Sequence, residues 1–223
     1  MIPANHRLIP LPDAIAEFGL EALFYRDGGY DALEDSVGSP EYGSPPMALV
    51  FDGDTRLTET FDAGTAFHKR DGHMDGPITP LEELLGRACT VVVNGSLQAP
   101  RIDTRDCQAL FVFGSVRCGA IEFWDGNFVW IAGDLDATRA VLATARHDDP
   151  DTADYVGQSY ACVQGSVHAP RVQTWFMCLG HLNWREGSGK EFCEDVEYED
   201  QDHLWKTDPV WLSSNGIDNA LGA

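Results

Sequence analysis

Apolar residues recur around a glycine five times between residues 91 and 184. The segments are VVVNGSLQA (91–99), LFVFGSVRC (110–118), VWIAGDLDA (129–137), ACVQGSVHA (161–169) and FMCLGHLNW (176–184). Their glycines are Gly95, Gly114, Gly133, Gly165 and Gly180. The first two intervals are about 19 residues each, the third is longer by an insertion of about 13 residues, and the fourth is about four residues shorter. This recurrent spacing indicates an internal structural repeat.

The positions on either side of each glycine alternate in polarity. Two places after the glycine the chain carries Leu97, Val116, Leu135, Val167 and Leu182. The residues one and three places after it are mostly polar, as at Ser96 and Gln98 in the first segment. Apolar residues at every second position define one face of a β-strand, so each segment predicts a strand with one buried side.

A second strand is predicted seven places past the glycine, at Ile102, Ile121 and Val172, after a corner such as Ala-Pro-Arg. A unit of about 19 residues is shorter than a propeller blade and suits one coil of a solenoid, in which equivalent strands pair in parallel. The predicted fold class is therefore mainly β, a capped β-solenoid (β-helix) of about five coils with a small α/β N-terminal flank. An ordinary β-sandwich is the alternative.

The apolar-x-Gly-[Ser/Asp]-apolar-x-Ala pattern over about residues 89–184 resembles the bacterial β-helical repeat proteins of the bactofilin (polymer-forming cytoskeletal) type. The resemblance implies a β-helix without cofactor or catalysis that assembles end to end. The chain departs from it through the insertion at about 144–160 and through long segments on both sides of the repeats. Those segments are expected to cap the repeat array.

Three parts of the chain follow from this reading: a flank or cap at 1–88, the repeats at 89–184 and an acidic segment at 185–223. Within the flank, apolar spacing predicts a short amphipathic helix over 11–25, and a strand is predicted at 47–53. A loop rich in Gly, Pro, Ser and Asp is expected over 26–46. Thr79-Pro80-Leu81-Glu82 has the residues of a helix N-terminus, which predicts a capping helix over about 80–87.

The strand before each glycine is apolar on its outward side as well, for example at Phe111, Trp130 and Met177. A strand that is apolar on both faces is covered on both faces. The N-terminal helix and strand are expected to provide this cover, and a partner or a second copy of the chain is the alternative.

Charge narrows the possible functions. The chain has 223 residues, with 36 Asp and Glu against 15 Lys and Arg, for a net charge of −21. This excludes a nucleic-acid binder that neutralises phosphates and argues against docking on an anionic membrane. No apolar run of about 18 residues and no signal peptide is evident, so a cytoplasmic protein is expected. The six cysteines form no CxxC pair and are expected to be free thiols.

Candidate catalytic groups are few, and no cofactor or metal is expected. Asp52-Gly53-Asp54 after an apolar strand is similar to the first motif of haloacid-dehalogenase-like phosphotransferases, but Thr55 comes one position too early for DxDxT. A hydrolase or phosphotransferase that uses Asp52 and Asp54 is therefore one alternative function. Histidines near carboxylates at 68–75 and 147–151 are possible metal ligands. An enzyme acting on polysaccharide is a further alternative, although such solenoid enzymes place carboxylates and basic residues on one outer face. The candidate outer carboxylates here are scattered along the sequence: Asp134, Asp136, Asp103 and Glu122.

Seven carboxylates lie between Glu191 and Asp202, interleaved with aromatic residues. Such a run is often only a solvated surface, but it also suits recognition of a basic protein, because carboxylates attract a cationic partner and aromatics anchor it. The residues predicted to bind the partner are Glu194, Asp195, Glu197, Tyr198, Glu199, Asp200, Asp202 and Trp205. The leading hypothesis is a non-enzymatic immunity protein (antitoxin) that neutralises a basic toxin such as a nuclease. A self-assembling bactofilin-like scaffold is the alternative, and a homodimer is possible.

Overall fold

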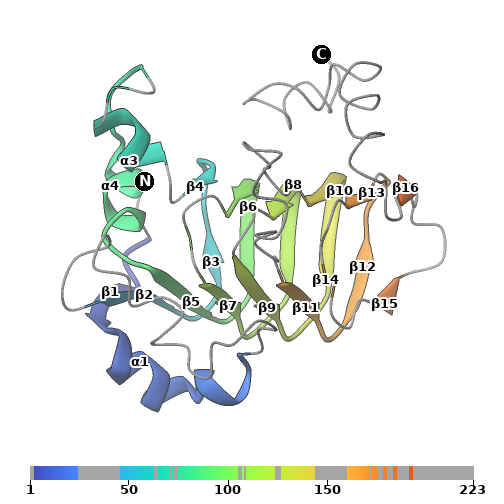
Figure 1. Cartoon of the computed structure of the whole chain (residues 1–223), viewed down its shortest axis with the longest axis horizontal. Coiled ribbons are helices and arrows are strands. Elements are labelled where there is room, and N and C mark those ends of the chain that lie inside the picture. The colour runs from blue at the N-terminus through green and yellow to red at the C-terminus, as the bar shows by residue number, and fades with distance from the viewer. Residues whose placement is uncertain are drawn as a thin grey trace, which may run out of the picture.

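Two β-sheets form the body of the molecule (Figure 1). The computed structural model describes residues 3–24, 46–62, 65–70, 72, 75–104, 107, 109–123, 127–143, 160–170, 172–174, 178–179, 183–184 and 191–192. Within these ranges, one sheet has seven strands in the order β1-β2-β5-β7-β9-β11-β14. The other has nine, with β15-β12-β10-β8-β6-β3 along its main path and β4, β13 and β16 attached beside it.

The seven-stranded sheet is built from the strands that precede the corner glycines, with β1 added at its N-terminal edge. Its members are β1 (His6–Pro10), β2 (Met47–Asp52), β5 (Thr90–Asn94), β7 (Ala109–Val112), β9 (Phe128–Ile131), β11 (Tyr160–Val163) and β14 (Cys178–Leu179). The nine-stranded sheet holds the strands that follow. They are β3 (Thr55–Arg56), β4 (Phe61–Asp62), β6 (Leu97–Asp103), β8 (Val116–Phe123), β10 (Leu135–Ala143), β12 (Ser166–His168), β13 (Val172–Thr174), β15 (Asn183–Trp184) and β16 (Glu191–Phe192).

The predicted repeat is confirmed by the strand pairing. Leu97 pairs with Val116, and Val116 pairs with Leu135, each one repeat further along the chain, in parallel strands. Leu135 then pairs with Val167 across the predicted insertion. The second predicted strand is confirmed too, because Ile102 pairs with Ile121. In each repeat the chain therefore passes once through each sheet.

Two details of the register differ from the sequence alignment. In the fifth segment, Ala161 pairs with Leu179 and Val167 with Trp184, where the alignment on Gly180 had placed Phe176 and Leu182. The observed partners are separated by nearly a full repeat, although the glycine spacing is shorter there. In the third repeat, β10 also carries one extra residue between Ala137 and Ala140, which shifts the pairing with β8.

The predicted fold class, a mainly β capped β-solenoid (β-helix), is wrong. The structure is a mixed α/β arrangement with two separate sheets and a few short helices, whereas a solenoid would stack one sheet in coils. One sheet is itself mixed, because β1 pairs antiparallel with β2. Sequence periodicity shows which strands are equivalent, but it does not show into how many sheets they divide. The sharp turn at each glycine directs the two strands beside it into different sheets.

An additional unit of the same pattern precedes the predicted repeats. Strand β2 pairs in parallel with β5, and β3 and β4 pair in parallel with β6. Gly53 occupies the corner position of this unit, next to Gly95. Gly53 was not among the predicted repeat glycines, because residues 63–89 separate its unit from the next one. Two helices form within that interval, α3 (Thr65–Arg70) and α4 (Pro80–Leu85).

The corner glycines lie in a column with no room for side chains. A Cβ on Gly95 would lie 2.5 Å from the carbonyl carbon of Gly53, and one on Gly114 would lie 2.7 Å from that of Gly95. At Gly165, a Cβ would lie 2.6 Å from the carbonyl carbon of Gly133. Successive backbones approach so closely here that only glycine fits, which explains why this residue recurs.

The residue after each glycine forms a second column, a side-chain ladder. Ser96 donates its N–H to Oδ1 of Asp54 at 2.8 Å, and Ser115 donates its N–H to Oγ of Ser96 at 3.3 Å. Asp134 donates to Oγ of Ser115 at 3.1 Å, and Ser166 donates to Oδ1 of Asp134 at 2.8 Å. Each side chain accepts the backbone N–H of its equivalent in the next repeat, which satisfies a donor that the corner geometry removes from the sheet.

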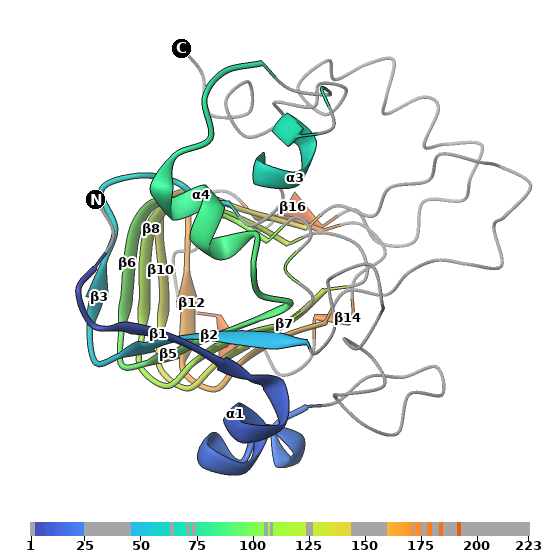
Figure 2. The ribbon, with the colours of Figure 1, turned by 90° about the vertical axis from the view of Figure 1, so that its left-hand side faces the viewer.

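The main core fills the space between the sheets. Its members include inward residues of successive strands, such as Val93, Val112 and Ile131, all fully buried. Leu81 and Leu85 of α4 belong to the same cluster, and α4 lies over the N-terminal end of the sheets (Figure 2). The predicted capping helix is thus confirmed.

The start of α4 has the predicted capping box. Thr79 accepts the N–H of Glu82 on its hydroxyl, and the Glu82 carboxylate accepts the N–H of Thr79 at 2.7 Å. Glu82 also pairs with Lys69 of α3 at 2.9 Å, and both side chains are largely buried. The capping box and the ion pair together hold α3 and α4 over the end of the core.

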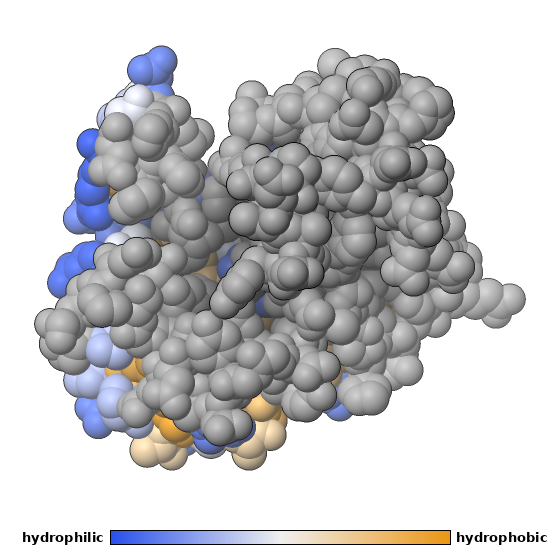
Figure 3. Space-filling view, viewed as in Figure 1, coloured by the Kyte–Doolittle hydropathy of each residue, from blue (hydrophilic) through white to orange (hydrophobic). Residues whose placement is uncertain are grey.

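The outward apolar face of the seven-stranded sheet is covered by the N-terminal flank, as expected. Helix α1 (Leu11–Phe18) and the 3-10 turn η1 (Leu20–Ala22) form a second apolar cluster with this face. The Phe18 ring lies 5.8 Å from that of Phe113, and Phe24 lies 4.9 Å from Phe128. Apolar residues reach the surface at the lower edge of the molecule, where α1 and η1 lie (Figure 3). Met177 lies outside the described residues.

The ladder generates a first prediction. Ser115→Ala removes the acceptor for the Asp134 N–H and should lower the free energy of unfolding by about 1 kcal/mol, since a lost hydrogen bond is worth this much. Ser166→Ala is the matched control, because its hydroxyl accepts no ladder bond among the described residues. Urea denaturation measures both variants. Equal stabilities of the two would contradict a stabilising role of the ladder.

The column of corner glycines generates a second prediction. In Gly114→Ala the new Cβ would meet the backbone of Gly95 at 2.7 Å, so adjacent repeats must move apart. Overpacking of this kind costs about 1–3 kcal/mol, which a thermal unfolding scan detects as a lower Tm. An unchanged Tm would show that the column tolerates a side chain.

Candidate binding site

The predicted partner-binding residues lie outside the described part of the chain. They are Glu194, Asp195, Glu197, Tyr198, Glu199, Asp200, Asp202 and Trp205. Most of the suggested metal ligands around 68–75 and 147–151 also fall outside it. Among the residues that are described, no group of three or more His, Cys, Asp or Glu is placed to hold a metal ion. The same residues contain no helix that is long and apolar enough to cross a membrane.

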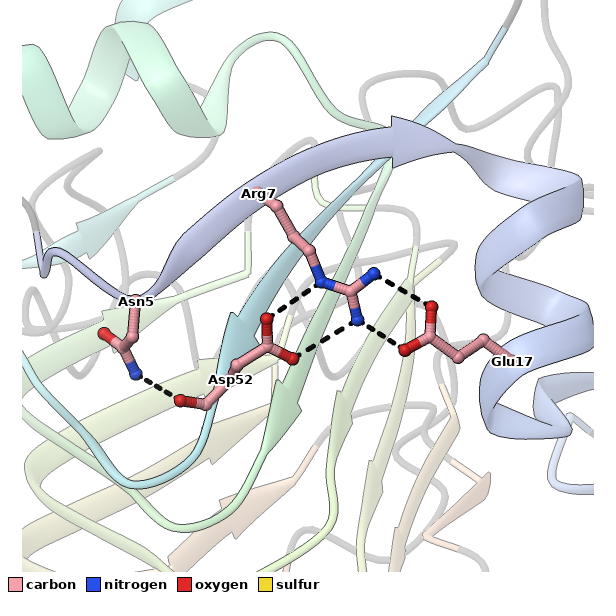
Figure 4. Close-up of polar contacts among 4 residues, drawn as sticks. All are labelled: Asn5, Arg7, Glu17 and Asp52. Atoms are coloured by element: carbon pink, nitrogen blue, oxygen red, sulfur yellow. Dashed lines mark hydrogen bonds and ion pairs between the residues drawn. The ribbon is translucent and has the colours of Figure 1, made fainter.

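Asp52, a candidate nucleophile, is one partner in an ion network at the sheet edge (Figure 4). Arg7 of β1 donates from Nε to Oδ2 of Asp52 at 2.8 Å and from Nη1 to Oε2 of Glu17 in α1 at 2.9 Å. The Asn5 amide donates to the backbone carbonyl of Asp52 at 2.6 Å. The network therefore links β1, β2 and α1. The paired guanidinium of Arg7 lowers the pKa of Glu17 below its usual value.

Asp54, the second candidate, begins the side-chain ladder through its bond to the Ser96 N–H. The two carboxylates of the Asp-Gly-Asp motif thus serve different contacts, one with the N-terminal flank and one across the glycine corner. Thr55 adds a local bond, donating its hydroxyl to the Gly53 carbonyl at 3.1 Å. The resemblance to a phosphotransferase motif has a structural explanation, because this motif is a corner of the repeat.

The other suggested outer carboxylates do not gather on one face. Asp134 belongs to the ladder, and Asp136 lies on β10. Asp103 and Glu122 are buried beside Arg101, whose Nη2 lies 3.4 Å and 3.8 Å from their carboxylate oxygens. These four residues therefore provide no pair of exposed acids for polysaccharide cleavage.

A row of polar residues crosses the outer face of the nine-stranded sheet, whose strands β6, β8 and β10 stand at the left of Figure 2. The strand pairing places Arg56, Gln98, Arg117, Asp136 and His168 next to one another, in that order. Gln98, Arg117, Asp136 and His168 each stand three places after a corner glycine, and Arg56 stands three places after Gly53. We call Arg56, Gln98 and Arg117 the donor row, because all three side chains carry N–H groups.

The donor row separates two hollows on the protein surface. The larger has a volume of about 720 Å³ and extends to the corner formed by Pro100, Gly119 and Thr138. The smaller, of about 360 Å³, lies toward the ladder at Asp54, Ser96 and Ser115. All three residues of the donor row line both hollows.

Two local features shape the larger hollow. Gly119 has no side chain there because a Cβ would lie 2.5 Å from the Pro100 carbonyl oxygen. The extra residue of β10 places Thr138 at the hollow and the exposed Arg139 beside Gly119, the Cδ of Arg139 being 3.8 Å from the Gly119 Cβ position. A bulge of this kind redirects side chains locally.

The hollow is cationic, although the chain is acidic. The Arg117 side chain is 75% exposed, and its Nε lies 3.9 Å from a carboxylate oxygen of Asp136. Arg56 and Arg139 are exposed and form no ion pair within the described residues. Burial, and then the charge of Asp136, raises the pKa of the thiol of Cys118, which lines the hollow, to about 12, and this disfavours the reactive thiolate at neutral pH.

The sequence pattern predicts only part of this site. It shows that the positions three places after each glycine are mostly polar, whereas the charges along the row become evident only from the strand pairing. Arg56 was missed because the unit at Gly53 was not recognised. The spacing of Arg56 from Gly53, equal to that of Arg117 from Gly114, is the signal that identifies it.

The ion network generates a pH prediction. Because the folded pKa of Glu17 is depressed, its contribution to stability is present above the unfolded pKa and is lost as pH falls through the folded pKa. Glu17→Gln should therefore lower the urea midpoint at neutral pH and leave it unchanged at pH values below the folded pKa. An equal difference at both pH values would show that the charge of Glu17 is not responsible.

Comparison of the chain with protein-family models, with curated proteins and with solved structures yielded no match. The resemblance to bactofilins therefore stays a prediction.

Proposed function

We propose that this chain is a non-enzymatic acidic binding protein that holds a basic protein partner. The observation that carries the proposal is the net charge of −21, with seven carboxylates between Glu191 and Asp202. A concentrated negative field attracts a cationic partner, speeds its association and disfavours acidic competitors.

The same segment has residues that suit a specific contact. Tyr198 stands among the carboxylates, and Phe192 and Trp205 stand at its two ends. Aromatic residues dominate the energetics of many interfaces because they bury a large area with few rotatable bonds. The proposed contact set is the one predicted above, from Glu194 to Trp205.

The most concrete form of this function is a bacterial immunity protein bound to a basic toxin such as a nuclease. A nuclease needs a cationic surface to hold phosphates, and a row of carboxylates is complementary to that surface. Asp52 and Asp54 both form hydrogen bonds within the fold, with Arg7 and with the Ser96 N–H. These contacts favour a binding function of the protein over a catalytic function of the two acids.

The alternative, a scaffold that assembles end to end, finds less support at the N-terminal end of the sheets. Helix α4 covers the core there, and the edge strand of the seven-stranded sheet is β1, which runs antiparallel to β2 and ends in Pro10. A second copy stacked in continuation of the parallel repeats would have to displace these elements. Proline also has no N–H to offer a further strand.

Charge reversal tests the proposal. The double variant Glu197→Lys/Glu199→Lys should bind the basic protein that copurifies from the native host at least tenfold more weakly than the wild-type chain, in about 50 mM salt. The difference should shrink as the salt concentration rises, because screening weakens the attraction. Calorimetric titration at several salt concentrations measures both effects.

The matched control is Asp13→Lys/Asp75→Lys, which changes the net charge equally at two exposed positions in the N-terminal flank. Equal loss of affinity in the two double variants would mean that only total charge matters and would remove the acidic segment from the contact. Sedimentation at micromolar concentration separates the alternatives further. A discrete complex supports the binding protein, whereas large polymers of the chain alone support the scaffold.

A further inference from the structure

The donor row is unusual for this protein because it concentrates positive charge on a chain that has few cations. Only 15 of the 223 residues are Lys or Arg. Two of them, Arg56 and Arg117, line the larger hollow on the nine-stranded sheet, and the Cδ of a third, Arg139, lies 3.8 Å from the Cβ position of Gly119, which also lines it. Within the described residues, the contact of Arg117 with Asp136 at 3.9 Å is the one ion pair these three form. The protein thus leaves exposed guanidinium groups beside a hollow.

The strand register brings the donors to one place. Arg56 pairs with Gln98, and Gln98 pairs with Arg117, on three adjacent parallel strands. Neighbouring strands lie about 4.8 Å apart, so the two arginine Cα atoms are separated by about 10 Å. A ligand between two flexible arginine side chains at this separation receives hydrogen bonds from both, and the Gln98 amide lies between them as a further donor.

The rest of the lining fits a polar ligand. Thr58 and Thr138 contribute hydroxyl groups at the larger hollow, and Asp136 lies where it orients the Arg117 guanidinium. Among the residues that the structure describes, no Phe, Tyr or Trp side chain lines either hollow, and His168 is the one residue at the larger hollow whose aromatic ring can stack on a sugar or base. The volume of about 720 Å³ lies within the range of small-molecule sites.

We propose that the donor row and the larger hollow bind a small anionic ligand through its carboxylate or phosphate oxygens. Arg56 and Arg117 hold the oxyanion groups, Gln98 donates a hydrogen bond between them, and the threonine hydroxyls bind the remaining polar atoms. Guanidinium groups match both kinds of oxyanion, because each presents two parallel N–H donors. This site uses residues different from those proposed to contact a basic protein, and it does not depend on that function.

Titration of the full chain with pyrophosphate and with citrate tests the proposal, in low salt and with NMR detection of the backbone amides. At least one probe should bind with a Kd below about 1 mM, and saturable shifts should be confined to the donor row and its neighbours such as Gly119. Binding of pyrophosphate alone assigns a phosphate ligand, and binding of citrate alone assigns a carboxylate ligand.

The variant Arg56→Gln/Arg117→Gln should lose at least tenfold in affinity for the bound probe. Its matched control is Arg70→Gln/Arg87→Gln, which removes two exposed charges near α4, away from the donor row, and should keep the affinity within about twofold. Because Arg56 and Arg117 are exposed, the first variant should unfold at nearly the wild-type temperature. If it does not, Arg56→Lys/Arg117→Lys replaces it and should also bind more weakly, since lysine lacks the two-pronged geometry.

Three results would overturn the proposal. The first is no saturable binding of either probe. The second is equal affinity in the donor-row variant and its control, which would place the bound anion elsewhere on the protein. The third is binding of a hexaglutamate peptide without binding of either small anion, which would make the row a contact for an acidic protein segment instead.

Discussion

The structure depends on a steric constraint at the corner between its two sheets. Successive turns of the chain approach so closely at Gly53, Gly95, Gly114, Gly133 and Gly165 that their backbones are in contact, and no Cβ fits between them. Close approach leaves backbone N–H groups that the sheets do not use. The Ser or Asp after Gly53, Gly95, Gly114 and Gly133 accepts one of these groups from the next repeat, so the steric and polar requirements are satisfied by two adjacent residues.

This corner also sets the register of the strand residues just after it in the units that begin at Gly53, Gly95, Gly114, Gly133 and Gly165. Because each repeat starts from an equivalent glycine, residues at equal distances past the corner come to lie in rows across the parallel strands. Inward rows build one continuous core, and outward rows place polar side chains of successive repeats next to one another. The donor row arises in this way. The chemistry of the donor row is therefore decided by the residues that stand three places after each glycine. The other residues of the same strands form the core and the sheet.

The N-terminal end and the outer apolar face of the repeats are closed by contacts that differ from those within the repeats. At the N-terminal end, α4 closes the core with leucines and is itself held by its capping box and by the Lys69–Glu82 pair. The outer apolar face is closed by α1 and η1 through aromatic contacts. The Arg7 network then fixes α1 and β1 to β2. These contacts are specific to single residues and have no counterpart in the repeat.

From the sequence alone, the repeat period, the parallel register between Gly95 and Gly165, the capped helix at Thr79 and the cover over the outer apolar face were all predictable, because each rests on local pattern or on burial. The division into two sheets, the antiparallel β1 and the register of the last repeat required the tertiary structure, since they depend on contacts between distant segments. The same is true of the site: the sequence shows the polar positions, but only the pairing of β3 with the distant β6 places Arg56 in one row with Arg117.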